Sequence, residues 1–322
     1  MNTYGNTFRV TTYGESHGPA VGAVIDGCPA GVRLDMDMID GWLERRRYGA
    51  PRSESDSVEW LSGLMDGVTL GTPLAFAIRN VDARPADYAH LEHMFRPGHA
   101  DYTYYMKYGV RDYRGGGRSS ARETVARVVA GAVAAQLMPG IEIGTEVECA
   151  ADGGASAASA LRADDTYGGV VRCRVTGVPA GVGEPVFGKL GAALAAAMMS
   201  IPSAIGFEMG AGFKAAGMSG SEYIDRWSDP EVAEAATSTD APSLTLTNHC
   251  GGIQGGISNG MPVEFGVAFH PVVSIPQPVE CLHEEGHLET VGIGGRHDRY
   301  HLHRAAVVVE AMTALCLANY MI

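Results

Sequence analysis

The residues of this chain that could do chemistry are concentrated in residues 96–127. This stretch contains seven Lys or Arg residues, one histidine and five tyrosines. Residues 115–117 are three consecutive glycines, and Arg118 follows them. A glycine-rich turn before a helix offers free backbone N–H groups and the positive end of the helix dipole to an anion. The sequence therefore predicts an anion site, with phosphate as the expected ligand. A capped surface helix after a flexible turn would give the same short pattern.

A helix is predicted to follow this turn. Ser120 and Glu123, three residues apart, form the pattern of a capping box. Apolar residues then recur at helical spacing from Val125 to Leu137. This spacing indicates a helix with one buried face.

A second basic cluster ends an earlier helix, predicted over residues 35–47. Ile39 and Leu43 mark its apolar face, and Arg46 falls on the same face by its spacing. Arg46 is therefore predicted to point inward and to need a partner anion, because a buried charge is costly unless it is paired. Arg52 follows in a polar segment that is predicted to be a loop.

Two histidines and one aspartate are candidates for proton transfer. His17 lies at the end of a predicted strand, and His99 lies in the basic stretch. Each could be a general acid or base, or a hydrogen-bonded structural residue. Asp298 lies beside Arg296 in a glycine-containing loop.

Two short motifs suggest other chemistries. Residues 14–18, GESHG, match the G-x-S-x-G elbow of serine hydrolases, which would make Ser16 a nucleophile. No helix is predicted behind Ser16, so this alternative is disfavoured. His283 and His287 lie in HEEGH, which resembles a zinc-protease helix, but Gly286 and a loop setting argue against one. The sequence therefore predicts no metal site.

Composition excludes several classes of protein. The chain has 322 residues and a net charge of −13, which argues against non-specific nucleic-acid binding. No stretch of 18 apolar residues occurs, so no membrane span is predicted. Six cysteines are scattered without a C-x-x-C pair, which indicates reduced thiols and a cytoplasmic protein.

One pattern of organisation occurs twice. Residues 26–32, DGCPAGV, and residues 176–182, TGVPAGV, each follow a predicted strand and precede a predicted helix, over 35–47 and 185–200. We interpret them as two related strand–turn–helix units within an α+β domain, although PAG turns are common. The last predicted helix, residues 304–320, is apolar nearly all round and should be buried in the core or in a subunit contact.

These stretches together resemble the chorismate synthase family, in order and over nearly the whole chain. The block at 95–124 is too long and specific to arise by chance. The matching stretches are FRVTTYGESHG at 8–18, RRR at 45–47, FRPGHADYTYYMKYGVRDYRGGGRSSARET at 95–124, GVPAGVGEPVF at 177–187, GGIQGGISNG at 251–260 and GRHD at 295–298.

The resemblance implies a fold and a reaction. The fold would be a single domain over residues 1–322, a β-α-β sandwich assembled as a homotetramer. The reaction would be the trans-1,4-elimination of phosphate from the small phosphorylated substrate 5-enolpyruvylshikimate 3-phosphate, giving chorismate. Reduced FMN would be required without net redox. The sequence leaves open whether the chain reduces its flavin with NADPH or relies on a separate reductase.

The resemblance also implies residue roles. His17 would protonate the leaving phosphate, His99 would help to protonate the reduced flavin, and Asp298 would act as base through the flavin. The substrate would be held by Arg46, Arg52, Arg118 and Arg296. The flavin would contact Arg118, Ser119, Ser120, Pro202, Ser203, Gly255, His270, Pro271, Val272, Val273, Ser274 and Arg296.

The chain departs from the family pattern at two positions near the expected flavin. Ile205 and His270 stand where lysines are usual. Each lost charge-assisted contact would weaken cofactor binding by about 1.5–3 kcal/mol. An alternative to the full activity is therefore a divergent relative that binds flavin or an anion with altered or lost catalysis.

Overall fold

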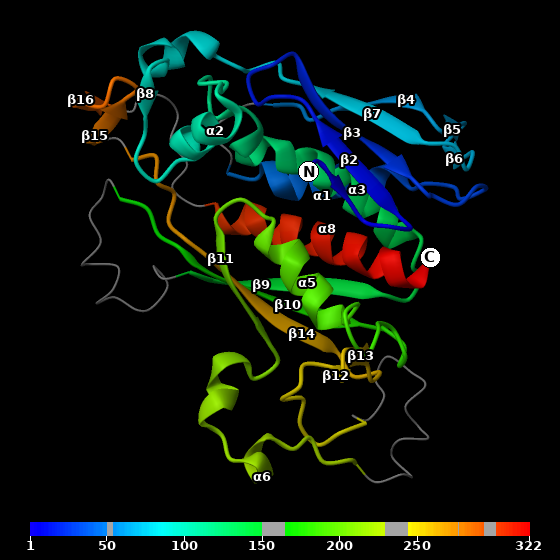
Figure 1. The fold of residues 1–322 in the computed structure, drawn as a ribbon. Helices are drawn as coiled ribbons and strands as arrows, with labels where there is room; N and C mark the ends of the chain where they lie inside the picture. Colours follow the sequence, from blue (N-terminus) through cyan, green and yellow to red (C-terminus); the bar gives the residue numbers. More distant parts are fainter. Residues whose placement is uncertain (50–53, 150–164, 229–243, 276, 293–300) are drawn as a thin grey trace.

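Two antiparallel sheets with helices between them make up most of the described chain (Figure 1). The computed structural model describes residues 1–49, 54–149, 165–228, 244–275, 277–292 and 301–322. Three residues with predicted roles, Arg52, Arg296 and Asp298, lie outside these ranges. The mixture of sheets and helices confirms the predicted α+β class.

The first sheet has the strand order β1-β2-β3-β7-β4, and each pair of neighbours is antiparallel. On β3, Val21, Ala23 and Ile25 alternate toward the core and are fully buried, as the two-residue period of a strand requires. The strands are β1 (Thr3–Tyr4), β2 (Arg9–Tyr13), β3 (Ala20–Asp26), β4 (Val58–Ser62) and β7 (Leu74–Arg79).

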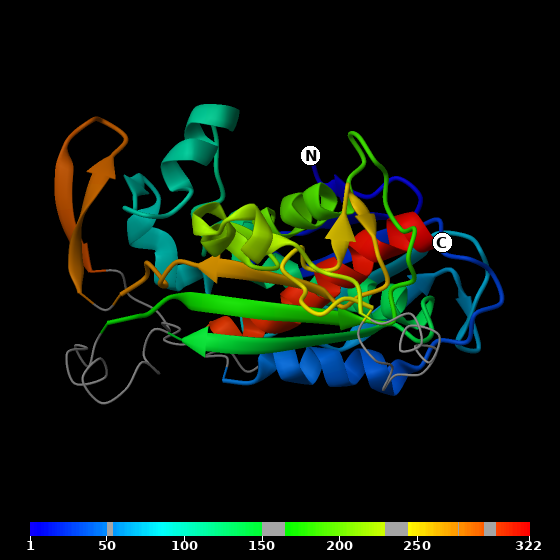
Figure 2. The ribbon, with the colours of Figure 1, turned by 90° about the horizontal axis from the view of Figure 1, so that it is seen from below.

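The second sheet has the order β11-β14-β10-β9 and is also antiparallel. A bulge between Ala204 and Gly206 shifts the register of β11 against β14. In Figure 2, β9, β10 and β14 lie in front of the C-terminal helix. The strands are β9 (Glu142–Cys149), β10 (Gly169–Thr176), β11 (Ala204–Met209) and β14 (Val263–Phe269).

Four helices fill the space beside and between the sheets. The first begins where the Asp35 side chain accepts a hydrogen bond from the Met38 N–H, and it buries Ile39 and Leu43 as predicted. The helices are α1 (Met36–Arg47), α3 (Thr124–Gln136), α5 (Leu190–Met199) and α8 (Leu302–Met321).

The C-terminal helix α8 is the centre of the core, and it contacts α1, α3, α5, β9 and β10. It packs so closely on α3 that a side chain at Gly131 would come within 2.5 Å of Ala311. By length and composition α8 is the one helix in the described ranges that could cross a membrane, but 83% of its apolar window is buried inside the protein. The prediction of a buried last helix is confirmed.

The two halves of the chain repeat the same topology. Each half begins with a hairpin, β2–β3 or β9–β10, which a helix follows, α1 or α5. An outer strand, a short hairpin and an inner strand come next, with β4 and β11 as the outer strands and β7 and β14 as the inner ones. The sheet orders β2-β3-β7-β4 and β9-β10-β14-β11 therefore correspond. The short hairpins pair β5 with β6 and β12 with β13. Their bounds are β5 (Leu64–Met65), β6 (Val68–Thr69), β12 (Ile253–Gln254) and β13 (Ile257–Ser258).

The two PAG turns make the same hydrogen bonds to these hairpins. In the first half, the Thr69 hydroxyl donates to the Pro29 carbonyl at 2.6 Å and accepts from the Val32 N–H at 3.0 Å. In the second, the Ser258 hydroxyl donates to the Pro179 carbonyl at 2.6 Å and accepts from the Val182 N–H at 2.9 Å. These matched contacts confirm that the two strand–turn–helix units have related structures.

A third, three-stranded sheet of order β16-β15-β8 projects from one end of the molecule (Figures 1 and 2). Short helices connect the larger elements. The strands and short helices are β8 (Met94–Phe95), β15 (Pro278–His283), β16 (Leu288–Gly292), α2 (Asp101–Tyr108), α6 (Gly220–Tyr223), and the 3-10 helices η1 (Pro85–Leu91), η2 (Gly117–Ser119), η3 (Ala121–Glu123) and η5 (Gly212–Gly217).

The helix predicted over residues 185–200 is shorter than expected. It begins at Leu190, because Gly183 forms a bridge to Ile257 and the Glu184 N–H donates to the Gly188 carbonyl. These contacts hold the preceding residues in a loop.

Candidate active site

His17 is held in the loop between β2 and β3, against the glycine turn at 115–117. A side chain at Gly115 would overlap the His17 imidazole, so this position requires glycine. Ser16 Oγ lies 3.1 Å from His17 Nδ1 and 3.2 Å from the Gly115 carbonyl oxygen. The Tyr88 ring meets the imidazole edge-on with centroids 4.9 Å apart. The ring orientation of His17 is therefore fixed from three sides.

The serine-hydrolase elbow does not form. Ser16 lies between two antiparallel strands of one sheet, and no helix follows it. Its side chain is buried, with 1% exposure, and its hydroxyl faces His17 and backbone carbonyls. A nucleophile must reach its substrate, so this geometry speaks against hydrolysis at Ser16.

Arg118 joins the glycine turn to the first sheet. Its Nη2 donates to Thr12 Oγ1 at 2.6 Å and its Nη1 to the Gly14 carbonyl at 3.2 Å. It lies at the start of the predicted helix, where the capping-box prediction is wrong. Ser120 caps the 3-10 turn η3 by accepting from the Arg122 N–H, while the Glu123 carboxylate pairs with Arg127 Nη2 at 2.8 Å.

Arg46 points inward, as its spacing predicted, and its partners belong to the protein. Its Nε and Nη2 donate to Thr124 Oγ1 at 3.2 and 3.1 Å, and Nη2 donates to the Ala121 carbonyl at 2.9 Å. Asp56, buried and at a positive φ of 53°, lies 3.6 Å from Nη1. Burial lowers the pKa of Arg46 to about 10, and Asp56 partly offsets this. The predicted partner anion is thus Asp56, which the sequence did not identify.

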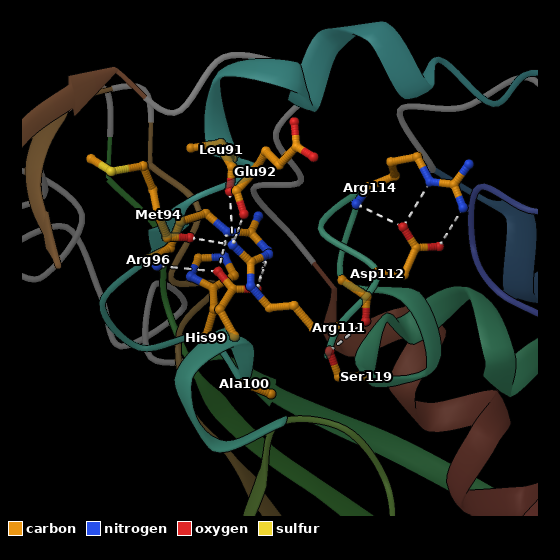
Figure 3. Close-up of polar contacts among 12 residues, drawn as sticks. Leu91, Glu92, Met94, Arg96, His99, Ala100, Arg111, Asp112, Arg114 and Ser119 are labelled. Atoms are coloured by element: carbon orange, nitrogen blue, oxygen red, sulfur yellow. Dashed lines mark hydrogen bonds and ion pairs between the residues drawn. The ribbon is translucent and has the colours of Figure 1, made fainter. Parts of the chain in front are cut away.

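An open cavity of about 800 Å³ lies between α2 and the glycine turn, and Arg118 lines it, whereas His17 and Arg46 do not. Figure 3 shows Arg114 held by Asp112 on one side of this region, with Nε to Oδ1 at 2.7 Å. The pKa of the Glu15 carboxyl in the same cavity is raised above its ordinary value, because the effect of burial outweighs the opposing effect of Arg118. The lining includes Glu15, Tyr104, Tyr108, Arg114, Arg118 and Ser119.

A larger hollow, of about 960 Å³, lies over the outer face of the second sheet. Its two arginines already pair with carboxylates of the same lining: Arg174 Nη1 lies 2.7 Å from Glu264, and Arg172 pairs with Glu208. It contains none of the predicted site residues. We therefore place the candidate site at the smaller cavity.

His99 is hydrogen-bonded to a residue predicted to bind the cofactor. Its Nε2 lies 2.7 Å from Ser274 Oγ, and its Nδ1 lies 3.0 Å from the Pro97 carbonyl oxygen. A side chain at Gly98 would press on Val273 at 3.0 Å, so the two loops are in close contact. Burial, with a contribution from Arg96, lowers the pKa of His99. Both effects favour the neutral form of the imidazole.

The buried side chains of Arg96 and Arg111 both lie against Asp101 and support the His99 loop. Figure 3 shows Arg96 and Arg111 beside His99. Arg96 donates from Nε to Asp101 Oδ2 at 2.7 Å, and its backbone N–H donates to the same oxygen at 3.1 Å. Burial alone would raise the pKa of Asp101, but Arg96 and then Arg111 hold it below its ordinary value. Sequence reasoning missed this role of Asp101, although the residue lies inside the stretch that it singled out.

Ser203 and His270 form the far side of this loop cluster. Ser203 has a positive φ of 67°, which a non-glycine residue rarely adopts, and its carbonyl accepts from the His270 N–H at 3.0 Å. Pro202 precedes this turn, and the Pro271 carbonyl oxygen lies 2.6 Å from His270 Nδ1. The Val272 carbonyl accepts from the Thr166 hydroxyl at 2.6 Å.

Gly255 is not brought to this site. It lies in the β12–β13 turn that precedes β14, whereas His270 follows the end of β14. The full length of that strand separates them. The predicted role of Gly255 has no support from contacts within one chain.

The chain has an α+β fold, and its candidate site is a cavity lined by arginine, tyrosine and carboxylate side chains. A family model described as chorismate synthase matches residues 8–153 and 146–322. The chain is 48% identical to the chorismate synthase of Porphyromonas gingivalis, over 99% of this chain and 95% of that protein. It is 45% identical to that of Opitutus terrae, over 99% of this chain and 96% of that protein.

A solved structure described as the crystal structure of chorismate synthase has the same fold. It is 29% identical, with a TM-score of 0.70, and the match covers 98% of this chain and 92% of that chain. The chain therefore belongs to the chorismate synthase family. Like the other members of the family, it is a phosphate-eliminating carbon–oxygen lyase of the shikimate pathway.

Proposed function

We propose that the cavity beside His17 and the loops around His99 together form the site where phosphate is eliminated from 5-enolpyruvylshikimate 3-phosphate. The observation that carries this proposal is the contact between His17 and the glycine turn, which leads directly into Arg118 and Ser119. A proton donor and an anion-binding turn are thereby adjacent. The protein would act as a single β-α-β sandwich domain.

The donor set of the described residues fits reduced FMN. Hydroxyl groups of Ser119, Ser203 and Ser274 and the Arg118 guanidinium suit a phosphate and polar ring atoms. The apolar Pro271 and Val273 suit a flat ring. Reduced FMN, when bound, would supply electron density to the breaking carbon–oxygen bond, without net redox. Asp298 and Arg296, outside the described residues, remain proposed as base and substrate-binding residue, as does Arg52.

The contacts of His17 suit a general acid. In its protonated form, Nδ1–H donates to the Ser16 hydroxyl, which in turn donates to the Gly115 carbonyl. A protonated imidazole also carries an N–H at Nε2, which would donate to the leaving phosphate. Arg118 lines the cavity and would bind the anion. Arg46 would either support the glycine turn through its hydrogen bond to Thr124 or bind the substrate directly.

Anaerobic turnover with chemically reduced FMN tests this assignment. We expect His17→Ala to lower kcat by about 10²–10⁴-fold, the usual contribution of a positioned general acid. His90→Asn, at the exposed end of η1, is the matched control and should retain wild-type turnover. An unchanged kcat in His17→Ala would overturn the role of His17.

We further propose that flavin binding is weakened in this chain. Ile205 lies at the bulge of β11 with 61% exposure, and His270 follows the strand paired with it. The divergent-relative alternative depends on these two residues. We expect Ile205→Lys to tighten reduced FMN binding by about tenfold or more, measured by anaerobic titration. An equal affinity in wild type and variant would contradict the proposal.

We propose a cytoplasmic homotetramer. Large apolar side chains in the second half support subunit contacts: Phe187, Phe213, Trp227 and Leu246 are 99%, 79%, 65% and 69% exposed. The six cysteines are all free, which suits a reducing compartment. Sedimentation equilibrium would give the mass of the assembly, and a monomer at micromolar concentration would contradict the tetramer.

A further inference from the structure

The small β8–β15–β16 sheet has little apolar material to hold it together. Its core consists of Leu91, Met94 and Cys281, separate from the main core. Figure 1 shows its β15–β16 hairpin projecting from the molecule. A core this small gives a hairpin little independent stability, so a further interaction would have a large effect on it.

Three potential metal ligands meet at the turn of this hairpin. His283 and His287 face each other across the turn, where the His283 N–H donates to the His287 carbonyl at 2.8 Å. Their imidazole rings stack with centroids 4.5 Å apart. Glu289 lies two residues beyond His287, on the same face of the strand, with Oε1 2.8 Å from His287 Nε2. One ligand atom from each residue lies within 4.8 Å of the other two.

We propose that His283, His287 and Glu289 bind a divalent transition-metal ion, with Zn²⁺ as the best match. Two imidazoles and a carboxylate, with a position left for water, are a common zinc ligand set. Ligand atoms about 2.0–2.2 Å from such an ion lie roughly 3.4 Å apart in a tetrahedron. Small rotations of side chains at an exposed turn would bring the three atoms to that spacing.

Neighbouring carboxylates complete the site. His283 Nδ1 accepts a hydrogen bond from the Glu285 N–H at 3.1 Å, and the Glu285 carboxylate oxygen lies 3.9 Å from the same nitrogen. Metal binding through Nε2 would place the ring proton on Nδ1, so the contact with the N–H would break and the carboxylate would become the acceptor. Such carboxylate–histidine–metal arrangements orient the ligand. His93 lies beside the site, its Nδ1 2.7 Å from Glu284, and its ring 6.1 Å from that of His283. The negative charge of Glu284, Glu285 and Glu289 favours a cation.

This site differs from the one that the HEEGH pattern resembles. A zinc-protease motif presents its two histidines from one face of a helix, whereas here they face each other across a β-turn. The metal would fasten β16 to β15, which pairs with β8 through Leu282 and His283. Because β8 leads into Arg96 and His99, the ion would stiffen the support of that loop.

Titration with Co²⁺, whose visible spectrum reports its ligand geometry, tests the proposal. We expect wild type to bind one equivalent per chain with the spectrum of a four- or five-coordinate site, displaced by Zn²⁺. His283→Asn/His287→Asn should weaken Co²⁺ binding at least 100-fold, and Glu289→Gln at least tenfold. His90→Asn should bind as wild type does. Equal affinity in wild type and the double variant would overturn the proposal, as would the absence of saturable binding to wild type.

Thermal unfolding gives a second readout that is independent of enzyme activity. Zn²⁺ should raise the Tm of wild type and of His90→Asn, and should leave the Tm of the double variant unchanged. An equal rise in all three proteins would place the ion elsewhere and contradict the site. Glu289→Gln keeps the side-chain shape, so it tests the carboxylate even if the double variant folds poorly.

Discussion

The two halves of the chain share a backbone and differ in chemistry. Their PAG turns make matched hydrogen bonds through Thr69 and Ser258, and their sheets have the same strand order. Yet α1 ends in three arginines, whereas the last turn of α5 contains no basic residue. Repeated backbone contacts therefore maintain the fold, and side chains outside them are free to differ.

The starts of the two long helices show the same contrast. Glu123 precedes α3, and its carboxylate pairs with Arg127 at 2.8 Å and with Arg118 at 3.9 Å. His301 precedes α8 at the equivalent position, and both of its ring nitrogens are buried and have no hydrogen-bond partner among the described residues. The helix start in the first half thus carries ion pairs beside the cavity, whereas the helix start in the second half carries an imidazole whose burial favours its neutral form.

The largest effect is expected where the halves are most alike. Gly27 and Gly177 both have positive φ, of 87° and 80°, and a side chain at either would overlap a backbone oxygen, of Thr7 or Gly140. We expect Gly27→Ala and Gly177→Ala each to lower the free energy of unfolding by about 2–5 kcal/mol, from left-handed strain plus overlap. Urea denaturation measures both.

Gly31→Ala is the control for these variants, since its φ is 82° but no atom lies within 4 Å of an added side chain. It should lose only the strain, about 1–2 kcal/mol. If Gly27→Ala and Gly177→Ala differed by much more than the measurement error, the two turns would not be energetically equivalent.

A substitution that moves His17, in the first half of the chain, should lower catalytic activity. We expect Gly115→Ala to lower kcat by about 10²-fold, because the added methyl group would displace the imidazole. Gly109→Ala is the control, with a similar φ of 73° and open space around it. Anaerobic turnover assays measure both, and similar rates in the two variants would show that the position of His17 does not limit the reaction.

Removing the bridging hydroxyl of either turn should cost stability and leave catalysis intact. Thr69→Val and Ser258→Ala each remove the partner of one N–H and one carbonyl in partly buried hydrogen bonds, which we expect to cost about 1–3 kcal/mol. The Tm should fall in both, with KM unchanged at a temperature where both are folded. A change in KM for one variant would show that its turn also shapes the site.

The smallest effect concerns pH and His301. Burial lowers its pKa to about 4, so between pH 6.5 and pH 4 the unfolded chain binds a proton that the folded chain does not. Its stabilising contribution is present above pH 6.5 and is lost as the pH falls toward 4, by roughly 1–2 kcal/mol after allowing for partial exposure. His301→Leu should flatten the dependence of unfolding free energy on pH in this window, and an unaltered slope would contradict the assignment.

Local patterns predicted the main helices, several strands of both sheets, among them β3 and β10, and the stretch that lines the cavity, but not β4 or β9. Such patterns depend on contacts between near neighbours, as at the Asp35 cap of α1. The β8–β15–β16 sheet was missed because Phe95 pairs with Leu282 across most of the chain, without a local signal. The capping box failed for a similar reason: the Glu123 carboxylate has an arginine partner one turn further along the helix.

The site was predicted in part. The contact of His99 with Ser274 agrees with the predicted grouping of residues, which came from family resemblance. Asp56 and Asp101 were missed, because a carboxylate's partner depends on tertiary packing and not on its neighbours in sequence. Residues such as Arg46 show the limit: spacing predicted the direction of the side chain but not the identity of its partner.

The central position of α8 has a consequence for biosynthesis. This helix follows all the other described elements in the chain, yet it contacts α1, α3 and the second sheet, and its Asn319 side chain accepts hydrogen bonds from the N–H groups of Asn6 and Thr7. Neither half can complete its core before α8 has left the ribosome. Until then the apolar strands and helices of the nascent chain stay exposed, which makes it a natural client for chaperones.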